Sequence, residues 1–486
     1  MHYLNWRKLS HASEEEIKKI QNKRLKYLIK HEIPYHPFYR EWFKKNNLSF
    51  NDIETTDDLV KLPFVSKADI APTEEDRGKP KQFMLQPDEE LIKKHASKGK
   101  LLKIIGQKIL KKDVKRKLEW EYKPIHLHFT TGRTALPTPF GYTARDLEYL
   151  KESANRLLDV INIDRNQVAI NAFPYSPHLA FWLAYYGLTT IGMTSLATGG
   201  GKVMGTQKIM DAIERLKAGL ILFIPGYCYH LLREAVKQKR DFSNVKYVIF
   251  GGERVSDGLR MKVKEFLKEL GAEDVQIFAT YALTESKTAW IQCTEESGYH
   301  IYPDLEFFEV IDKEGNRVKA GEPGELVYTA LDWRGSIVLR YRTGDMTKGI
   351  EYGRCHFCGK TVPRIRPDIQ RSSDVKEFQL TKLKGELVNL NNFYPLLSGM
   401  KEIEEWQVEI RKKNNDPYEI DEIIIHLCPK KDVPYEKLSQ TVQKQIKDDM
   451  FVNVQTDQME LNTLLEKLGM ETELKEKRIV DNRPKV

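Results

Sequence analysis

Apolar and polar residues follow two different periods along the chain, one typical of helices and one typical of strands. Residues 13–32 place five apolar side chains at helical spacing, which predicts an amphipathic helix that buries them: Ile17, Ile20, Leu25, Leu28 and Ile29. Residues 246–250 and 275–278 are short β-branched and aromatic runs, typical of buried strands. A helical pattern over 256–270 separates these two runs. The alternation predicts an α/β fold with mainly parallel sheets flanked by helices.

Both predicted strands end in residues that suit a binding site. Gly251, Gly252 and Glu253 follow the first strand, and Tyr281, Thr284 and Glu285 come after the second. Ligands of open α/β sheets bind outside the carboxyl ends of the strands. The alternative is that these are two ordinary strand ends.

The carboxyl-terminal part of the chain has a different pattern. Residues 377–388, 406–410 and 422–427 predict strands, and residues 435–449 and 461–468 predict helices. We therefore expect a large amino-terminal domain over 1–370 and a small α+β domain over 371–486.

A lysine-rich segment interrupts the large domain at about residues 72–122. Lysines crowd residues 92–117, and five apolar residues form one side of a predicted helix: Leu101, Leu102, Ile104, Ile105 and Ile109. Such a helix can lie on a membrane or bind an acidic partner. We expect the simpler arrangement, a helix packed on its own protein with a solvated lysine face.

Composition narrows the functional classes. A chain of 486 residues with 41% hydrophobic and 30% charged residues fits a globular enzyme of two or three domains. The net charge of +8 is small for this length and does not predict nucleic-acid binding. We find neither an apolar run of about 18 residues nor the apolar core of a signal peptide, so we expect no membrane span and a cytoplasmic location.

Cysteine spacing predicts a metal site. Cys355 and Cys358 form a Cys-x-x-Cys pair, which can share one tetrahedral zinc ion, and Cys293 with His300 can complete the ligand set. Such a set has no open position and would hold a structural Zn²⁺. The alternatives are a disulfide between Cys355 and Cys358, free thiols, or His356 in place of His300.

A loop between residues 128 and 138 combines hydroxyls, glycine and a cation. Its Thr130, Thr131, Gly132, Arg133 and Thr134 offer donors and one positive charge, which suits phosphate oxygens. A simple turn before Pro137 is the alternative.

Three motifs in order resemble the adenylate-forming superfamily, whose members activate a carboxylate with ATP as an acyl-adenylate. They are Gly251-Gly-Glu253, Tyr281-Ala-Leu-Thr-Glu285 and Tyr341-Arg-Thr-Gly-Asp345. The pattern Ile33-Pro-Tyr-His-Pro-Phe-Tyr39 is similar to the phenylacetate–CoA ligase-like branch. The resemblance covers most of the chain, except about residues 72–120.

The resemblance implies a role for each motif. Glu285 would hold Mg²⁺, and this ion, together with Thr284, Arg133 and the other phosphate-loop donors, would offset phosphate charge. Asp345 would accept hydrogen bonds from the ribose hydroxyls of ATP, and Tyr281 would stack on adenine.

The carboxyl-terminal region carries further implied roles. The tail resembles a terminal motif that makes Lys475 the adenylation lysine, with Lys477 as a weaker candidate. Arg371 lies at the start of a hinge, beyond which the small domain would rotate as a lid. Departures from the family pattern stand at Arg133, Ala135, Leu136 and Leu474.

The predicted activity is therefore an AMP-forming acid–thiol ligase acting on a small carboxylic acid, with CoA as the acceptor. Two rivals share the fold: a ligase that passes the acyl group to an amine or a carrier protein, and a catalytically silent relative that acts as a binding module. Self-association into a homodimer is a further expectation.

Overall fold

The computed structural model describes residues 4–73, 75–110, 112–130, 137–253, 255, 257–367, 369–371, 381–383, 386–388, 390, 393–412, 421–450, 452–469 and 476–483. Two compact units contain these residues. The first unit comprises Met1–Ala197 and Gln276–Ile369, and the second comprises Thr198–Val275 and Gln370–Val486. The expected division at residues 370 and 371 stays a prediction.

Helices at the amino terminus cover the first unit. The helix α2 (Glu14–His31) begins at a capping box in which Ser13 and Glu16 satisfy each other's backbone N–H groups. Its predicted apolar side is buried, apart from Ile20, which is half-buried. The other short helices of this region follow in order: α1 (Trp6–Leu9), η1 (Ile33–Tyr35), α3 (Pro37–Lys45), η2 (Thr56–Lys61), α4 (Lys67–Ile70) and η3 (Lys79–Phe83).

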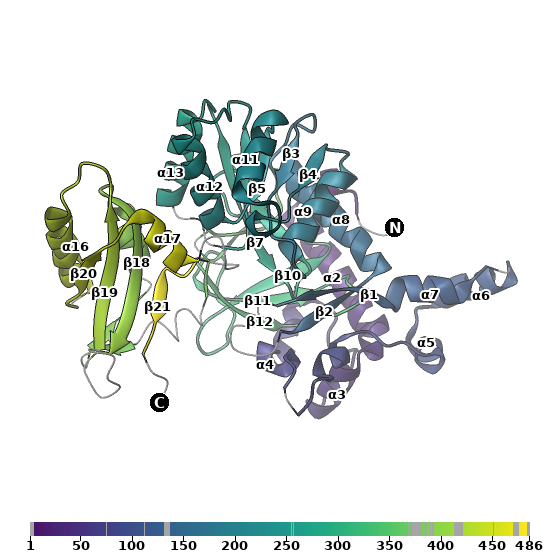
Figure 1. Cartoon of the computed structure of the whole chain (residues 1–486). Helices are drawn as coiled ribbons and strands as arrows, with labels where there is room; N and C mark the ends of the chain where they lie inside the picture. Colours follow the sequence, from purple (N-terminus) through teal and green to yellow (C-terminus); the bar gives the residue numbers. More distant parts are fainter. Residues whose placement is uncertain are drawn as a thin grey trace. The chain divides into compact units, whose positions relative to one another are not determined.

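Three helices form an arm that projects from the rest of the first unit (Figure 1). They are α5 (Glu89–His95), α6 (Lys98–Ile109) and α7 (Val114–Tyr122). The predicted lysine-rich helix exists as α6 and contacts its own protein through Lys100, but the expected burial of its apolar side is wrong, because α6 has no buried side chain. Helical periodicity reports which residues share a face, and packing depends on tertiary contacts that the pattern does not contain. In the described part of the chain, no helix is long and apolar enough to cross a membrane.

The strands of the first unit form hairpins and one parallel pair. The strands β1 (Pro124–Phe129) and β2 (Pro139–Thr143) are antiparallel, whereas β3 (Ala169–Asn171) and β4 (Ser195–Ala197) are parallel and are linked through α9 (Leu179–Thr190). The helix α8 (Ala144–Val160) follows β2.

The remaining strands of the first unit form two antiparallel sets. One set runs in the order β13 (Ile350–Glu351), β14 (Arg364–Ile365), β9 (Tyr299–His300), β8 (Thr288–Gln292) and β7 (Gln276–Leu283). The other set is β10 (Glu306–Ile311), β11 (Gly324–Ala330) and β12 (Tyr341–Thr347). Short connections such as the four residues between β7 and β8 permit only antiparallel pairing.

The second unit combines a strand–helix segment with the carboxyl-terminal fold. The parallel strands β5 (Leu220–Phe223) and β6 (Tyr247–Phe250) alternate with helices, as the sequence pattern predicts. The helices are α10 (Gly201–Met204), α11 (Thr206–Arg215), α12 (Pro225–Lys237) and α13 (Asp257–Glu269). The predicted α/β class is therefore confirmed. The expectation of mainly parallel sheets is wrong for the described residues, because most strand pairs, including β7–β8, β10–β11 and β11–β12, are antiparallel.

The carboxyl-terminal part contains the predicted α+β arrangement. Its four-stranded sheet has the order β20 (Gln455–Gln458), β19 (Asp421–Pro429), β18 (Ile403–Lys412) and β21 (Ile479–Asp481). The helices α15 (Phe393–Gly399), α16 (Tyr435–Met450) and α17 (Leu461–Leu468) accompany it, and a short hairpin joins β16 (Thr381–Leu383) to β17 (Glu386–Val388). Apolar residues of β18, β19 and α16 form a core that includes Val408, Ile425 and Val442, each fully buried.

Candidate functional site

The turn between β7 and β8 carries two of the predicted site residues. Leu283 pairs with Thr288, so residues 284–287 form the turn, with Thr284 and Glu285 at its start. The strand β7 extends to Leu283, five residues beyond the predicted end at Phe278. Tyr281 therefore lies within the strand, where it pairs with Trp290.

Two side-chain hydrogen bonds join this region to β12. The Tyr281 hydroxyl donates to Oδ2 of Asp345 at 2.7 Å, and the Tyr341 hydroxyl donates to Oε1 of Glu285 at 2.9 Å. Asp345 is 3% exposed. The first unit thus brings together the two carboxylates of the second and third motifs, each held by a tyrosine hydroxyl.

A buried ion pair that the sequence pattern does not predict supports the same turn. The Lys287 ammonium lies 2.8 Å from Oδ2 of Asp146 on α8, and both side chains are fully buried. The Asp146 carboxylate also accepts hydrogen bonds from the backbone N–H groups of Arg334 at 2.8 Å and Gly335 at 2.6 Å. Burial lowers the pKa of Lys287, while the charge of Asp146 opposes this shift. The only sequence signal was a lysine two residues after Glu285.

The predicted phosphate loop is described only at its edges. The Thr130 hydroxyl accepts a hydrogen bond from the backbone N–H of Thr138 at 3.1 Å, and the Thr130 N–H donates to the Thr138 carbonyl at 3.1 Å. Four further predicted residues lie outside the described part of the chain: Thr131, Gly132, Arg133 and Thr134. Lys475 also lies outside it, and Arg371 is described only as a residue of the short strand β15 (Gln370–Arg371).

The glycine motif forms a loop in the second unit. The Gly251 N–H donates to the Phe223 carbonyl at 3.2 Å. This hydrogen bond joins the start of the loop to the last residue of β5. Gly252 has φ +86°, a left-handed conformation that favours glycine. Oε1 of Glu253 accepts a hydrogen bond from the backbone N–H of Glu476 at 3.2 Å. The residue that follows Lys475 in sequence therefore contacts the glycine motif.

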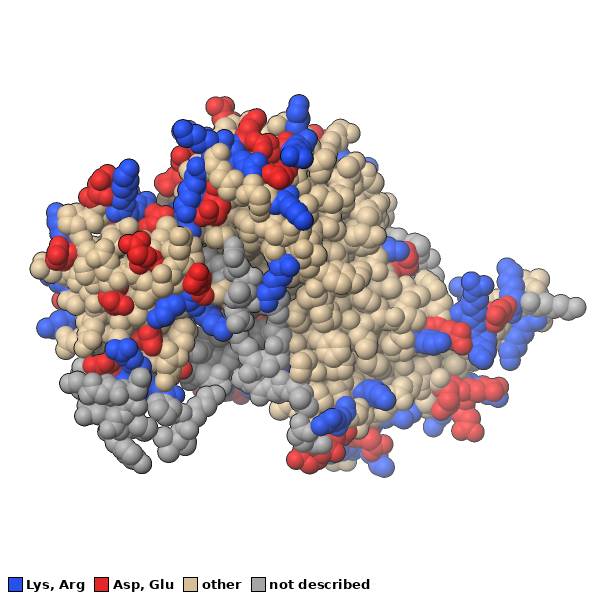
Figure 2. All heavy atoms as spheres, viewed as in Figure 1, with Lys and Arg blue, Asp and Glu red and all other residues tan. Residues whose placement is uncertain are grey.

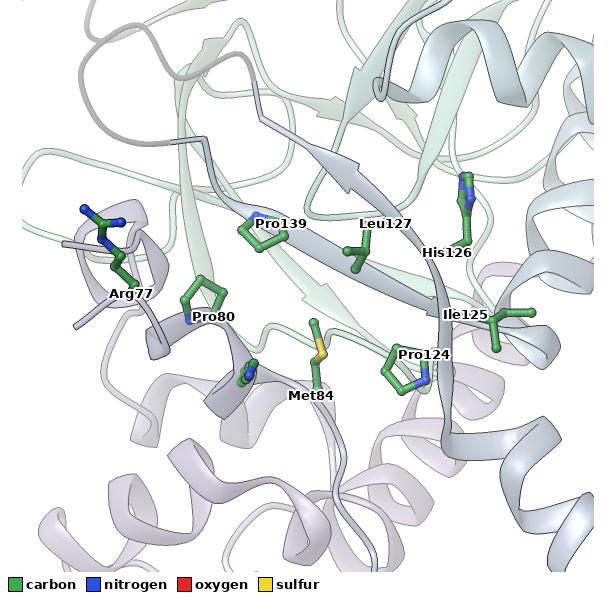
Figure 3. Close-up of a pocket in the computed structure, with 9 residues that line it drawn as sticks. Arg77, Pro80, Met84, Pro124, Ile125, His126, Leu127 and Pro139 are labelled. Atoms are coloured by element: carbon green, nitrogen blue, oxygen red, sulfur yellow. The ribbon is translucent and has the colours of Figure 1, made fainter. Parts of the chain in front are cut away.

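A pocket of about 410 Å³ lies between η3 and the β1–β2 hairpin, in the first unit (Figure 3). Prolines and aliphatic side chains make up most of its wall, with three basic residues among them: Arg77, Lys81 and His126. His126 and His128 approach within 2.9 Å through their Nε2 atoms. Burial lowers the pKa of His128 to about 3, so the ring is neutral at physiological pH. None of the predicted site residues lines this pocket.

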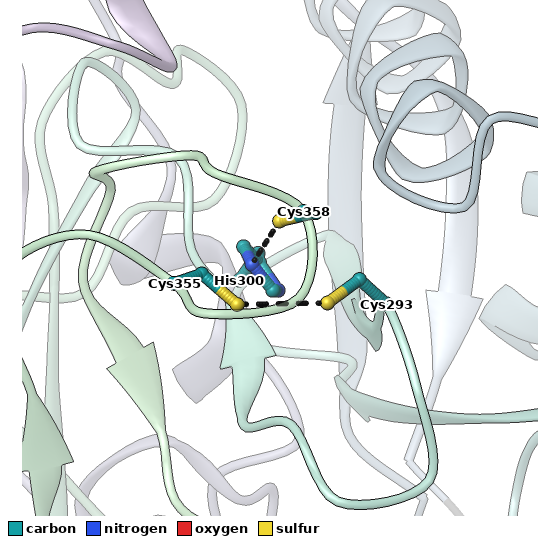
Figure 4. Close-up of side chains that lie close together, drawn as sticks. All are labelled: Cys293, His300, Cys355 and Cys358. Atoms are coloured by element: carbon teal, nitrogen blue, oxygen red, sulfur yellow. Dashed lines mark hydrogen bonds between the residues drawn. The ribbon is translucent and has the colours of Figure 1, made fainter.

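The four predicted metal ligands come together in the first unit (Figure 4). Their ligand atoms all lie within 4.8 Å of one another. Cys293 follows β8 and His300 belongs to β9, whereas Cys355 and Cys358 lie in the loop between β13 and β14. The Cys358 Sγ is 3.2 Å from Nε2 of His300, and the Sγ atoms of Cys293 and Cys355 are 3.7 Å apart.

The structure bears on two of the alternatives left by the sequence, the disulfide and His356. All five cysteines are free, so the disulfide between Cys355 and Cys358 is absent. His356 is exposed, and His300 supplies the nitrogen of the cluster instead. Hydrogen bonding from Cys293 lowers the pKa of Cys358 to about 3. Three sulfurs and one nitrogen converging on one point suit a tetrahedral ion with no open position.

Cys228 and Cys428 are buried elsewhere, as predicted. Burial raises the pKa of both thiols, which keeps them protonated and unreactive.

The sequence is similar to a known enzyme family and to named members of that family. The sequence model of the AMP-binding enzymes matches residues 45–330. The phenylacetate-coenzyme A ligase of Thermus thermophilus is 27% identical over 369 residues, which are 74% of this chain and 72% of that protein. The phenylacetate-coenzyme A ligase of Escherichia coli is 26% identical over 342 residues, which are 69% of this chain and 68% of that protein.

A solved structure shares the fold. A 2-hydroxyisobutyryl-CoA ligase in complex with 2-HIB-AMP superimposes with a TM-score of 0.77 over 99% of this chain and 94% of that chain, at 19% sequence identity. Because the family model spans more than half of the residues, the chain belongs to the AMP-binding enzyme family.

Proposed function

We propose that this chain is an ATP-dependent, AMP-forming ligase that converts a carboxylic acid into an acyl-adenylate and then transfers the acyl group to CoA. The observation that carries the proposal is the pair of tyrosine–carboxylate hydrogen bonds, Tyr281 to Asp345 and Tyr341 to Glu285. They hold the carboxylates of two family motifs in fixed positions, as a preorganised site requires.

The Asp345 carboxylate would recognise the ribose of ATP. One of its oxygens accepts from Tyr281, and a carboxylate has further lone pairs for the two ribose hydroxyls. Tyr281 would stack on adenine, and Gly251 and Gly252 would let the backbone approach the nucleotide closely. Glu253 would contact the nucleotide from the same loop.

The oxygen atoms of Glu285 and Thr284 suit a hard cation as metal ligands. Glu285 and Thr284 offer carboxylate and hydroxyl oxygens, the ligand type that Mg²⁺ prefers. When bound, Mg²⁺ would neutralise phosphate charge. The phosphate loop would contribute further donors and one cation that act on the same charge, from Thr130, Thr131, Gly132, Arg133 and Thr134. The two anions, ATP and the carboxylate, could then approach each other.

We propose Lys475 as the residue that stabilises negative charge on the α-phosphate and on the attacking carboxylate. The hydrogen bond from the adjacent Glu476 to Glu253 supports this role, because it links the tail to the glycine motif within the second unit. Residues 371–486 would act as the lid, with Arg371 at its hinge, and would reorient before the acyl group passes to CoA.

We propose a structural Zn²⁺ at Cys293, His300, Cys355 and Cys358. The closed ligand set has no position for substrate, so this metal would hold two loops together and take no part in the reaction.

The experiment that tests the ligase proposal separates the two half-reactions. ATP–pyrophosphate exchange with a panel of carboxylic acids measures adenylation, and thioester formation with CoA measures transfer. Exchange without thioester, but with amide formation, would favour the ligase that uses an amine, and acyl loading of a carrier protein would favour the other rival.

No exchange with any acid, alongside intact ATP binding, would favour the catalytically silent relative. The specific reason to include that outcome is the departures from the family pattern at Arg133, Ala135, Leu136 and Leu474. The homodimer and the cytoplasmic location stay predictions, which sedimentation and fractionation would check.

A further inference from the structure

The helix α6 of the arm is held to the rest of the first unit through Lys100. The Lys100 ammonium contacts the carboxylates of Glu32 at 3.4 Å and Glu121 at 3.3 Å, and it also hydrogen-bonds to the hydroxyl of Tyr122. Lys100 therefore marks the side of α6 that faces the rest of the first unit.

The opposite side of α6 carries a row of exposed apolar side chains. Leu102, Ile105 and Ile109 are 69%, 53% and 75% exposed. At about 100° per residue they form one stripe, and this stripe lies roughly opposite Lys100. A Cβ added at Gly99 or Gly106 would meet nothing within 4 Å, so the space beside the stripe is open. We call Leu102, Ile105 and Ile109 the apolar ridge.

Lysines flank the apolar ridge. At about 100° per residue, Lys103 lies on one side of the ridge and Lys108 on the other. Both side chains are exposed. Residues 98–117 contain nine basic residues and a single acidic one. Their net charge of +8 equals that of the whole chain. Figure 2 shows basic side chains gathered over the arm, with acidic side chains among and below them.

Each part of this arrangement narrows the class of partner. An apolar ridge alone would suit a groove on another protein, but lysines along both edges require negative charge on both sides of the ridge. A helix of 12 residues is about 18 Å long and has no acidic residue of its own. A surface that is anionic around an apolar interior, over that whole length, is a lipid bilayer with acidic headgroups.

We propose that α6 docks this enzyme on anionic membrane surfaces, with the apolar ridge inserted at the level of the acyl chains and the lysines among the headgroups. The helix would lie in the plane of the interface. This inference does not depend on the acid that the enzyme activates, and its test does not use catalysis.

The test is sedimentation of the full chain with vesicles. Binding is measured with vesicles of phosphatidylcholine containing about 30% phosphatidylserine and with pure phosphatidylcholine, at about 0.1 M and about 1 M salt. We expect binding to the anionic vesicles at low salt, and much weaker binding to neutral vesicles or at high salt.

Paired variants separate the ridge from the lysines. Ile105→Ser with Ile109→Ser should abolish binding, and Lys103→Gln with Lys108→Gln should weaken it about 30-fold, at about 1 kcal/mol for each basic side chain near the surface. The matched controls replace exposed residues on other helices. They are Lys444→Gln with Lys447→Gln on α16, and Met261→Ser on α13. The controls should bind as the unchanged chain does.

Each outcome decides the proposal. If the unchanged chain stays in the supernatant with anionic vesicles, or if the control and ridge variants bind equally, the proposal is wrong. Self-association that the ridge variants abolish, measured by sedimentation velocity in the absence of vesicle binding, would assign the ridge to a second copy of the chain instead. Thermal unfolding of every variant excludes loss of fold as the cause.

Discussion

The ion pair between Lys287 and Asp146 offers the sharpest test of how the β7–β8 turn is held. Both side chains are fully buried, and Lys287→Met removes the charge while it keeps most of the side-chain volume. Removing one partner of a buried ion pair leaves the other charge uncompensated and lowers the free energy of unfolding by about 3–5 kcal/mol. Asp146 keeps its backbone donors from Arg334 and Gly335, so we expect the lower end of this range, about 3 kcal/mol.

The matched control is Lys151→Met on the same α8 helix that carries Asp146. Lys151 pairs with Glu148 at 2.8 Å, and both side chains are about one third exposed. Solvent-exposed ion pairs contribute about 0–1 kcal/mol, so this variant should unfold close to the unchanged chain.

The assay is urea unfolding followed by tryptophan fluorescence. Trp333 is a local probe, since the Lys287 ammonium lies 5.4 Å from the centre of its ring. Because Glu285 lies two residues before Lys287, ATP–pyrophosphate exchange should also fall in Lys287→Met. Equal unfolding midpoints for Lys287→Met and Lys151→Met would refute the claim that the buried pair holds the turn.

Four further predictions follow from the other sites. Protein never exposed to chelator should contain about one zinc per chain by metal analysis, and Cys358→Ser should lower both zinc content and melting temperature; zinc-free protein of unchanged stability would contradict the metal site. Asp345→Ala should weaken ATP binding in calorimetry, because the ribose hydroxyls lose a charged acceptor, and unchanged affinity would contradict that role. Lys475→Ala should slow acyl-adenylate formation about 10²–10³-fold and leave transfer from supplied acyl-AMP to CoA nearly unchanged, whereas equal losses in both steps would argue against a lid that alternates. Burial raises the pKa of Glu306 to about 8 from 4.5, so the stability due to its protonated form is complete below about pH 4.5 and is lost as the pH rises through 8; Glu306→Gln should flatten this dependence in urea titrations at several pH values.

Features that depend on local chemistry could be predicted from the sequence. Cys355 and Cys358 predict half of a ligand set by their spacing alone, and Cys293 with His300 were predicted as the other half because they lie close together in sequence. The helix α2 was predicted because its apolar residues recur at helical spacing within one short segment, from Ile17 to Ile29.

Features that depend on distant partners could not be predicted in this way. The strand β7 continues through Tyr281 because Tyr281 pairs with Trp290, which the local pattern around Phe278 does not contain. Asp146 and Lys287 are 141 positions apart, and neither lies in a pattern that names the other. The helical pattern of α6 was predicted correctly, but the prediction that its apolar side is buried was wrong. Burial depends on whether another element covers that side, which the local sequence does not contain.

An ion bound to the cysteine–histidine cluster would also constrain the unfolded chain. It would act as a cross-link, because it would tie Cys293 to Cys355 across 62 positions of sequence. Closing a loop of that length removes about 4 kcal/mol of chain entropy from the denatured ensemble. The closed loop includes β12 and therefore Asp345, so the chain segment that carries this carboxylate would be confined even before the sheet around it forms.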